Sequence, residues 1–141
     1  MEMKHVFTEE QILTPDAKMP DLTNADPETL CSAVVSLLDG HKAQNIKVLE
    51  VTDQTILADY FVICTGNSNT QVKGLAGEVE YKMNLSGVDY LRMEGYEEGT
   101  WVIMDYASVL VHIFVRDQRE FYNLEKLWSE GKDIDISALL K

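Results

Sequence analysis

The stretch Thr100–Arg116, TWVIMDYASVLVHIFVR, predicts the centre of the fold. It reads as two β-strands, residues 101–106 and 109–115, because β-branched and aromatic residues dominate both runs. Ala107 and Ser108 lie between the two runs and would connect them as a tight two-residue turn. The stretch therefore predicts a β-hairpin.

The two faces of this hairpin differ in chemistry, since side chains alternate along a strand. One face is apolar throughout and is expected to face the core; it carries Val102, Met104, Tyr106, Val109, Val111, Ile113 and Val115. On the other face, the register of a two-residue turn pairs Trp101 with Phe114, Ile103 with His112 and Asp105 with Leu110. Such a mixed face is typical of an interaction surface. A covering layer, such as a C-terminal helix, explains it equally well.

Composition is that of an ordinary globular domain. The chain has 141 residues, of which 45% are hydrophobic and 26% charged, so one domain with a real core is expected. The 24 acidic residues outnumber the 12 basic residues, which gives a formal net charge of −12. This balance disfavours bare nucleic acid and anionic membranes and favours a basic protein surface as partner. The alternative is that the charge only maintains solubility.

The cysteines and the N-terminal residues indicate a cytoplasmic protein. Cys31 and Cys64 lie in apolar surroundings without metal-ligand spacing, which predicts buried free thiols in a reducing compartment. No run approaches the ~20 apolar residues of a membrane-spanning helix. The N-terminal sequence also lacks the features of a secretory signal or transit peptide. We therefore expect no membrane association.

The remaining elements follow from periodicity and capping signals. Residues 1–25 lack periodicity and are predicted to form an N-terminal extension, flexible or docked, that buries little. Residues 26–128 form the predicted domain, and residues 129–141 form a C-terminal tail. Within the domain we expect helices at 27–40, 69–85 and 117–128, and strands at 46–51, 60–64, 90–93, 101–106 and 109–115. The order α-β-β-α-β-β-β-α predicts an α/β fold with a mixed five-stranded sheet and flanking helices.

The helix at 69–85 has an N-terminal signal that also bears on function. Ser68 and Gln71 form a predicted capping box, and the preceding loop, residues 65–69, is placed where anions often bind. This loop has one Gly and no Lys, so it is neither a P-loop nor a dinucleotide fingerprint. The capping interpretation explains its residues without a ligand.

Catalytic and metal-binding patterns are weak in this chain. Two-metal phosphoryl transfer requires paired carboxylates, but Asp59 and Asp105 each stand alone in or beside a predicted strand. No other histidine lies in a regular element beside His112, so a histidine metal cluster is not expected. We therefore predict no enzymatic activity, no cofactor and no metal.

Several motifs together resemble the Iojap family of ribosomal silencing factors. They are D-Y-F-V-I-C-T-G-x-S-x-x-Q-V at 59–72, E-G at 94–95, W-V at 101–102, D-Y at 105–106, V-H-I-F at 111–114 and R-x-F-Y-x-L-E-x-L-W at 119–128. The similarity covers about residues 28–128. The family usually has Gly-Asp in the hairpin turn, where this chain has Ala107-Ser108. This departure questions the assumed turn, because primed hairpin turns need a positive φ at their first position.

The resemblance implies a fold similar to a nucleotidyltransferase core that lacks its catalytic acids. It also implies a translational repressor that binds the large ribosomal subunit at ribosomal protein L14, on the intersubunit face, and sterically blocks joining of the small subunit. The partner-contact residues that it implies are Trp101, Asp105, Tyr106 and His112. Several family members form homodimers. Two alternatives stay open: a degenerate nucleotide-binding or nucleotidyl-transfer enzyme that uses residues 65–69, and a large-subunit assembly factor.

Overall fold

A computed structural model describes residues 3–140 of the chain. The elements lie in the order α1 (Glu9–Leu13), α2 (Pro27–Gly40), β1 (Gln44–Glu50), β2 (Tyr60–Gly66), α3 (Asn69–Leu85), β3 (Arg92–Glu94), β4 (Trp101–Asp105), β5 (Val109–Val115), α4 (Arg116–Tyr122), α5 (Leu124–Leu127), β6 (Lys132–Ile134) and the short 3₁₀ helix η1 (Ser137–Leu139). The predicted strands and the first two predicted helices are present, with small shifts at their ends.

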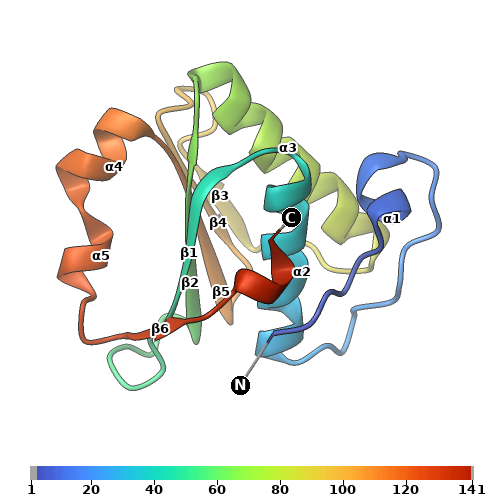
Figure 1. Cartoon of the computed structure of the whole chain (residues 1–141), viewed down its shortest axis with the longest axis horizontal. Coiled ribbons are helices and arrows are strands. Elements are labelled where there is room, and N and C mark those ends of the chain that lie inside the picture. Colours follow the sequence, from blue (N-terminus) through green and yellow to red (C-terminus); the bar gives the residue numbers. More distant parts are fainter. Residues whose placement is uncertain (1–2, 141) are drawn as a thin grey trace.

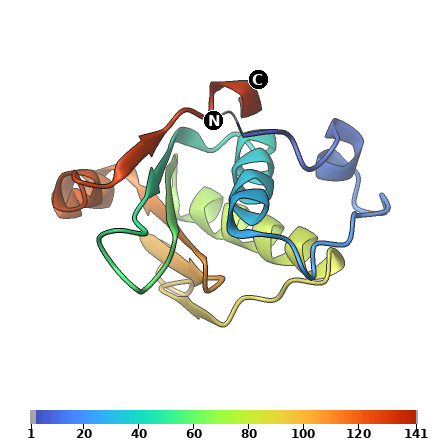
Figure 2. The same cartoon turned by 90° about the horizontal axis from the view of Figure 1, so that it is seen from below.

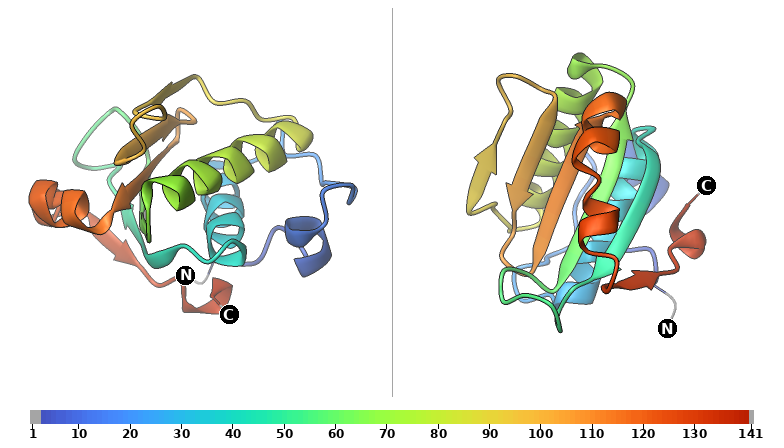
Figure 3. Two further views of the ribbon diagram at one scale, coloured as in Figure 1. Left: turned by 90° about the horizontal axis from the view of Figure 1, so that it is seen from above. Right: turned by 90° about the vertical axis from the view of Figure 1, so that its left-hand side faces the viewer.

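The molecule has three layers (Figure 1). A mixed sheet with strand order β3-β4-β5-β2-β1-β6 forms the middle layer. The strands β2 and β5 are parallel, and the other neighbours are antiparallel. Helices α2 and α3 cover one face of the sheet, which we call the inner face, whereas α4 and α5 lie on the opposite, outer face (Figures 1 and 3).

The hairpin has the register that alternation predicts. Trp101 pairs with Phe114, Ile103 with His112 and Asp105 with Leu110. The apolar face is turned toward α2 and α3, and all of its members belong to the main core or pack against it. The run at 60–64 is also confirmed as a central strand, because β2 is buried along its whole length between β1 and β5.

Side-chain caps begin the two long helices as predicted. The Asp26 carboxylate accepts a hydrogen bond from the Thr29 N–H at 2.7 Å, with Pro27 at the first helical position. At α3, the Ser68 hydroxyl accepts from the Gln71 N–H at 3.1 Å, and the Gln71 side chain accepts from the Asn67 N–H. The bonds to Asp26 and Ser68 satisfy donors that a helix N-terminus otherwise leaves without partners. The second half of the predicted capping box differs, because the Gln71 side chain bonds Asn67, the residue before the cap, instead of Ser68.

Both ends of the chain are more structured than the sequence predicts. In the N-terminal extension, Met3, Phe7, Ile12 and Leu22 are buried in the main core, so the prediction that it buries little is wrong. In the tail, β6 pairs with β1 and Leu139 is buried. The sheet therefore has six strands rather than five. The signal for β6 was missed because three residues, two of them charged, show no alternation.

The last predicted helix is broken in two. Asn123 adopts a left-handed conformation with φ of 47° and separates α4 from α5. The break removes Phe121 and Leu127 from the predicted apolar face, and both side chains are exposed. Leu124 and Trp128 still pack on the sheet, in a second core cluster with Phe61, Ile63 and Phe114.

Candidate functional site

The outer face of the sheet is covered over only part of its width. Helices α4 and α5 lie over β5, β2 and β1, and they leave β3 and β4 uncovered among the described elements (Figure 3, right). We call this uncovered region, with the aromatic residues at its border, the docking face. It consists of Arg92, Glu94, Trp101, Ile103, Asp105, Phe121 and Tyr122, all of which are exposed or half-buried.

Trp101 connects the docking face to the second core cluster. Its ring stacks on Phe114 with centroids 4.9 Å apart, and the ring of Tyr122 lies 4.7 Å away on α4. Its indole Nε1–H donates to Nδ1 of His112 at 3.2 Å. Trp101 is thus half-buried and oriented by its neighbours, as an aromatic anchor at an interface would be. It does not project freely into solvent.

His112 lies beneath Trp101 and is 7% exposed. Its Nδ1 accepts from Trp101, so the neutral ring carries its proton on Nε2, which has no hydrogen-bond partner. Burial lowers the pKa of His112 to about 4, because desolvation disfavours the charged imidazolium. The structure therefore makes His112 a support for Trp101, and a direct contact with a partner is not supported.

Asp105 is partly exposed on the docking face, and its carboxylate also stabilises the hairpin turn. One of its carboxylate oxygens accepts from the Ala107 N–H at 2.8 Å. Ala107 has a positive φ of 68°, the conformation that the turn position was expected to require. The Ser108 N–H bonds back to the Tyr106 carbonyl at 2.9 Å, which tightens the turn. Asp105 thus stabilises the turn and presents a charge beside it.

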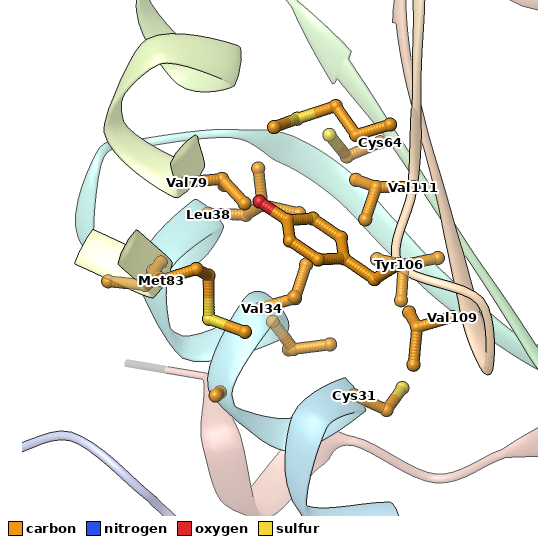
Figure 4. Close-up of a cluster of buried hydrophobic side chains, with 14 of the residues drawn as sticks. Cys31, Val34, Leu38, Cys64, Val79, Met83, Tyr106, Val109 and Val111 are labelled. Carbon is orange, nitrogen blue, oxygen red and sulfur yellow. The ribbon is translucent and has the colours of Figure 1, made fainter. Parts of the chain in front are cut away.

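Tyr106 lies on the other side of the hairpin from Trp101 and Asp105. It is 5% exposed and packs in the main core with Val34, Leu38, Val79 and Met83 (Figure 4). Its hydroxyl has no hydrogen-bond partner, and burial raises its pKa. A direct contact between Tyr106 and the partner of the docking face is therefore not supported. The alternation of the strand already placed Tyr106 on the core side.

Two parts of the docking face were absent from the sequence prediction. Arg92 and Glu94 join it because β3 pairs with β4 in the register Arg92–Asp105 and Glu94–Ile103. Phe121 and Tyr122 join it because the helix breaks at Asn123; Phe121 is 78% and Tyr122 is 47% exposed. The sequence carries no signal for the pairing partner of β3, whereas an Asn in a helical pattern is a weak signal for a break.

The loop at 65–69, the alternative anion site, contributes only Thr65 to a polar cavity of about 660 Å³ at the carboxyl ends of the parallel strands β2 and β5. The most buried cation of this cavity is Arg119, which donates to the Asn45 carbonyl at 2.7 Å and to the Thr65 hydroxyl at 2.8 Å. Arg119 also pairs with Glu125 at 3.3 Å. These contacts engage the guanidinium within the protein, so the cavity does not present it to an anion.

The described residues, 3–140, contain neither a cluster of metal-ligating side chains nor a membrane-spanning helix. In this range, no three His, Cys, Asp or Glu side chains are grouped so that they could hold a metal ion. None of the helices in the same range has the length and apolarity to cross a membrane. Cys31 and Cys64 are buried free thiols, as predicted, and burial raises the pKa of Cys64 to about 12.

The fold and the docking face define an α/β domain that presents a half-covered sheet with an aromatic and charged border. Residues 24–141 match the family model described as ribosomal silencing factor during starvation. The chain belongs to this family, which confirms the resemblance drawn from its motifs. The match includes the tail, which the motif comparison had left out.

Two relatives and one solved structure show the extent of the similarity. A ribosomal silencing factor of Halalkalibacterium halodurans is 35% identical over 113 residues, covering 80% of this chain and 97% of that protein. A mouse protein, mitochondrial assembly of ribosomal large subunit protein 1, is 32% identical over 99 residues. The match covers 68% of this chain and 43% of the mouse protein. A crystal structure from Chromobacterium violaceum has a TM-score of 0.72 at 32% identity and covers 79% and 92% of the two chains.

Proposed function

We propose that the protein binds the large ribosomal subunit through the docking face, at ribosomal protein L14, and sterically prevents joining of the small subunit. The observation that carries this proposal is the uncovered sheet beside Trp101 in a chain of the silencing-factor family. A central aromatic anchor surrounded by polar side chains is the usual anatomy of a protein interface. No catalytic step is involved, and the protein acts as a ribosome-associated repressor.

Charge supports a basic protein as the partner. The chain carries twice as many acidic as basic residues, and Glu94 and Asp105 lie within the docking face itself. Glu97 and Glu98 follow in the exposed loop after β3. Carboxylates at this position would attract the basic side chains of a ribosomal protein during encounter. Binding should therefore weaken as salt screens these exposed charges.

Co-sedimentation with purified large subunits tests the binding step. The Ile103→Lys variant places a cation in the middle of the docking face, so we expect affinity to fall about thirtyfold or more, the effect of losing a hot spot of ~2 kcal/mol. Leu85→Lys is the matched control, because Leu85 is also partly exposed but lies on α3, on the inner side of the sheet. Equal pelleting of the two variants would contradict the assignment of the docking face.

The name of the mouse relative favours a second candidate function, in which the protein assists assembly of the large subunit. This function would use the same docking face, so the binding assay does not separate the two. The discriminating measurement is subunit maturation: cells that lack the protein would accumulate large-subunit precursors if it acts in assembly. Normal maturation with excess joining of subunits under starvation would favour silencing.

A further inference from the structure

Residues 3–23 lie outside the family match, which begins at residue 24, but are part of the fold. Residues 3–23, which we call the strap, run along the helical layer at the end of the molecule opposite α4 and α5 (Figure 2). Met3, Phe7, Ile12 and Leu22 of the strap are buried in the main core. The relative from Halalkalibacterium halodurans matches over 97% of its length with only 80% of this chain. The strap is therefore not part of the segment that defines the family.

A buried lysine side chain of α3 makes polar contacts with the strap. The side chain of Lys82, on α3, is 2% exposed, and its ammonium donates to the Gln11 carbonyl at 2.7 Å and to the Thr14 carbonyl at 2.9 Å. Both carbonyls belong to the end of α1, where helical carbonyls lack partners within the helix and the helix dipole favours a cation. A buried ammonium requires such acceptors. Lys82 and the end of α1 therefore satisfy each other.

Two glycines of the domain make room for the strap. A Cβ at Gly40, the last residue of α2, would lie 2.3 Å from the Cγ2 of Ile12. A Cβ at Gly87 would lie 2.5 Å from the Thr23 hydroxyl. The Leu22 N–H also donates to the Ser86 carbonyl at 2.8 Å, just after α3. The strap thus fits a surface of α2 and α3 whose shape depends on small residues.

We propose that the strap opens as one unit while the rest of the domain stays folded, and that Lys82 is its latch. No residue of the strap pairs with a strand of the sheet in the described structure, whereas the sheet strands hold one another through continuous ladders. Segments that are fixed by a few helix contacts and isolated hydrogen bonds open at lower free energy than a central sheet. Opening uncovers the apolar sides of α2 and α3 and leaves the docking face unchanged.

Native-state hydrogen exchange of the full chain tests this proposal. The amides of Ile12, Thr14 and Leu22, which donate to Thr8, Glu10 and Ser86, report on the strap, and those of β2 and β5 report on global unfolding. In the wild-type protein, we expect the strap amides to be protected and to exchange together, at least about tenfold faster than the β2 and β5 amides. If the strap amides exchange only as fast as those of β2, the strap opens only with global unfolding and the proposal fails.

The latch is tested by Lys82→Met, which keeps the apolar stem and removes the ammonium. Protection of the strap amides should fall by at least about tenfold, because hydrogen bonds to a charged group are lost, while the β2 amides change much less. Lys126→Met, at an exposed position of α5, is the control for loss of one positive charge. If the strap amides of the two variants are equally protected, Lys82 is not the latch.

A second variant tests the strap by a different route. Gly40→Ala should open the strap by steric conflict with Ile12. Gly74→Ala is its control, because a Cβ at Gly74 meets nothing within 4 Å on α3, and helical Ala is normally favourable there. Faster exchange of the strap amides in Gly40→Ala but not in Gly74→Ala supports the proposal. Unchanged strap protection in Gly40→Ala would contradict the fit of the strap against α2.

Discussion

In the proposed function, Trp101 contributes to both stability and recognition, because its ring is packed against neighbours and is only half-buried. Its contacts with Phe114, His112 and Tyr122 indicate that Trp101→Ala costs roughly 2–3 kcal/mol of unfolding free energy, less than a fully buried Trp. The same variant should lose large-subunit binding. Urea denaturation and pelleting of one preparation check both effects. Retained binding by a destabilised Trp101→Ala protein would make Trp101 purely structural.

His112 predicts a pH dependence with a definite sign. The unfolded chain protonates His112 below pH 6.5, whereas the folded protein resists until about pH 4. Lowering the pH through this window therefore favours the unfolded state, by about 3 kcal/mol for the difference between the two pKa values. His112→Gln keeps an acceptor for Trp101 and removes the titration. Denaturation curves at pH 7 and pH 4.5 should show a smaller loss of stability in the variant than in the wild type. Equal losses would contradict the burial of a neutral imidazole.

Ala107 occupies the hairpin turn at an energetic cost. Its φ of 68° lies in the left-handed region, which costs an L-residue about 1–2 kcal/mol and glycine almost nothing. Ala107→Gly should therefore raise the unfolding free energy by about 1 kcal/mol. Ser108→Gly is the control, since Ser108 does not have a positive φ and glycine there only adds flexibility to the unfolded chain. A thermal melt in which both variants are destabilised would contradict the turn geometry.

At the level of elements, the stability of the protein when the N-cap of α3 is changed shows whether Ser68 acts only as a helix cap. The hydroxyl caps the helix through the Gln71 N–H, so Ser68→Ala should cost about 1 kcal/mol. Chemical denaturation measures this loss, and Ser68→Asp should restore most of it, because a carboxylate also caps and suits the helix dipole. An unchanged stability in Ser68→Ala would mean that the hydroxyl is held for another purpose, and the nucleotide alternative would return.

Elements that depend on local signals were predictable, and those that depend on tertiary pairing were not. The hairpin register followed from alternation alone, and both long helices began at the capping residues Asp26 and Ser68. The strand β6 was missed because its ladder partner β1 is about 80 residues away in the sequence. The strap was also missed, since its four buried side chains are spaced irregularly and are buried only by parts of the chain that are distant in the sequence. Local periodicity carries no information about such contacts.

The candidate site, like the fold, was predictable where the alternation of side chains along a strand determines it. The mixed face of the hairpin, with Trp101 and Asp105, is where the sequence placed it. Packing between side chains decides which of its residues stay accessible. His112 is buried among Phe61, Trp101 and Phe114, while Tyr122 is left open. Tyr106 was expected to contact the partner because of the family resemblance. The alternation along its strand, however, already predicts that its side chain lies in the core.

At the scale of the whole molecule, the strap and the docking face lie on opposite sides, and we propose separate roles for them. The strap and its Lys82 latch complete the helical layer on one side, and the docking face faces away on the other (Figures 1 and 2). A partner that covers only the docking face would not contact the strap. In the proposed function, the rest of the domain would occupy the space that the small subunit needs, and this would block subunit joining.

The most direct test of this account is the yield of joined ribosomes in a mixture of purified large and small subunits, resolved on a density gradient. Saturating wild-type protein should reduce the joined peak and appear in the large-subunit fraction. Leu85→Lys should act like the wild type, and Ile103→Lys should leave the joined peak intact at the same concentration. An undiminished joined peak with the wild-type protein bound to large subunits would contradict steric silencing by this docking face.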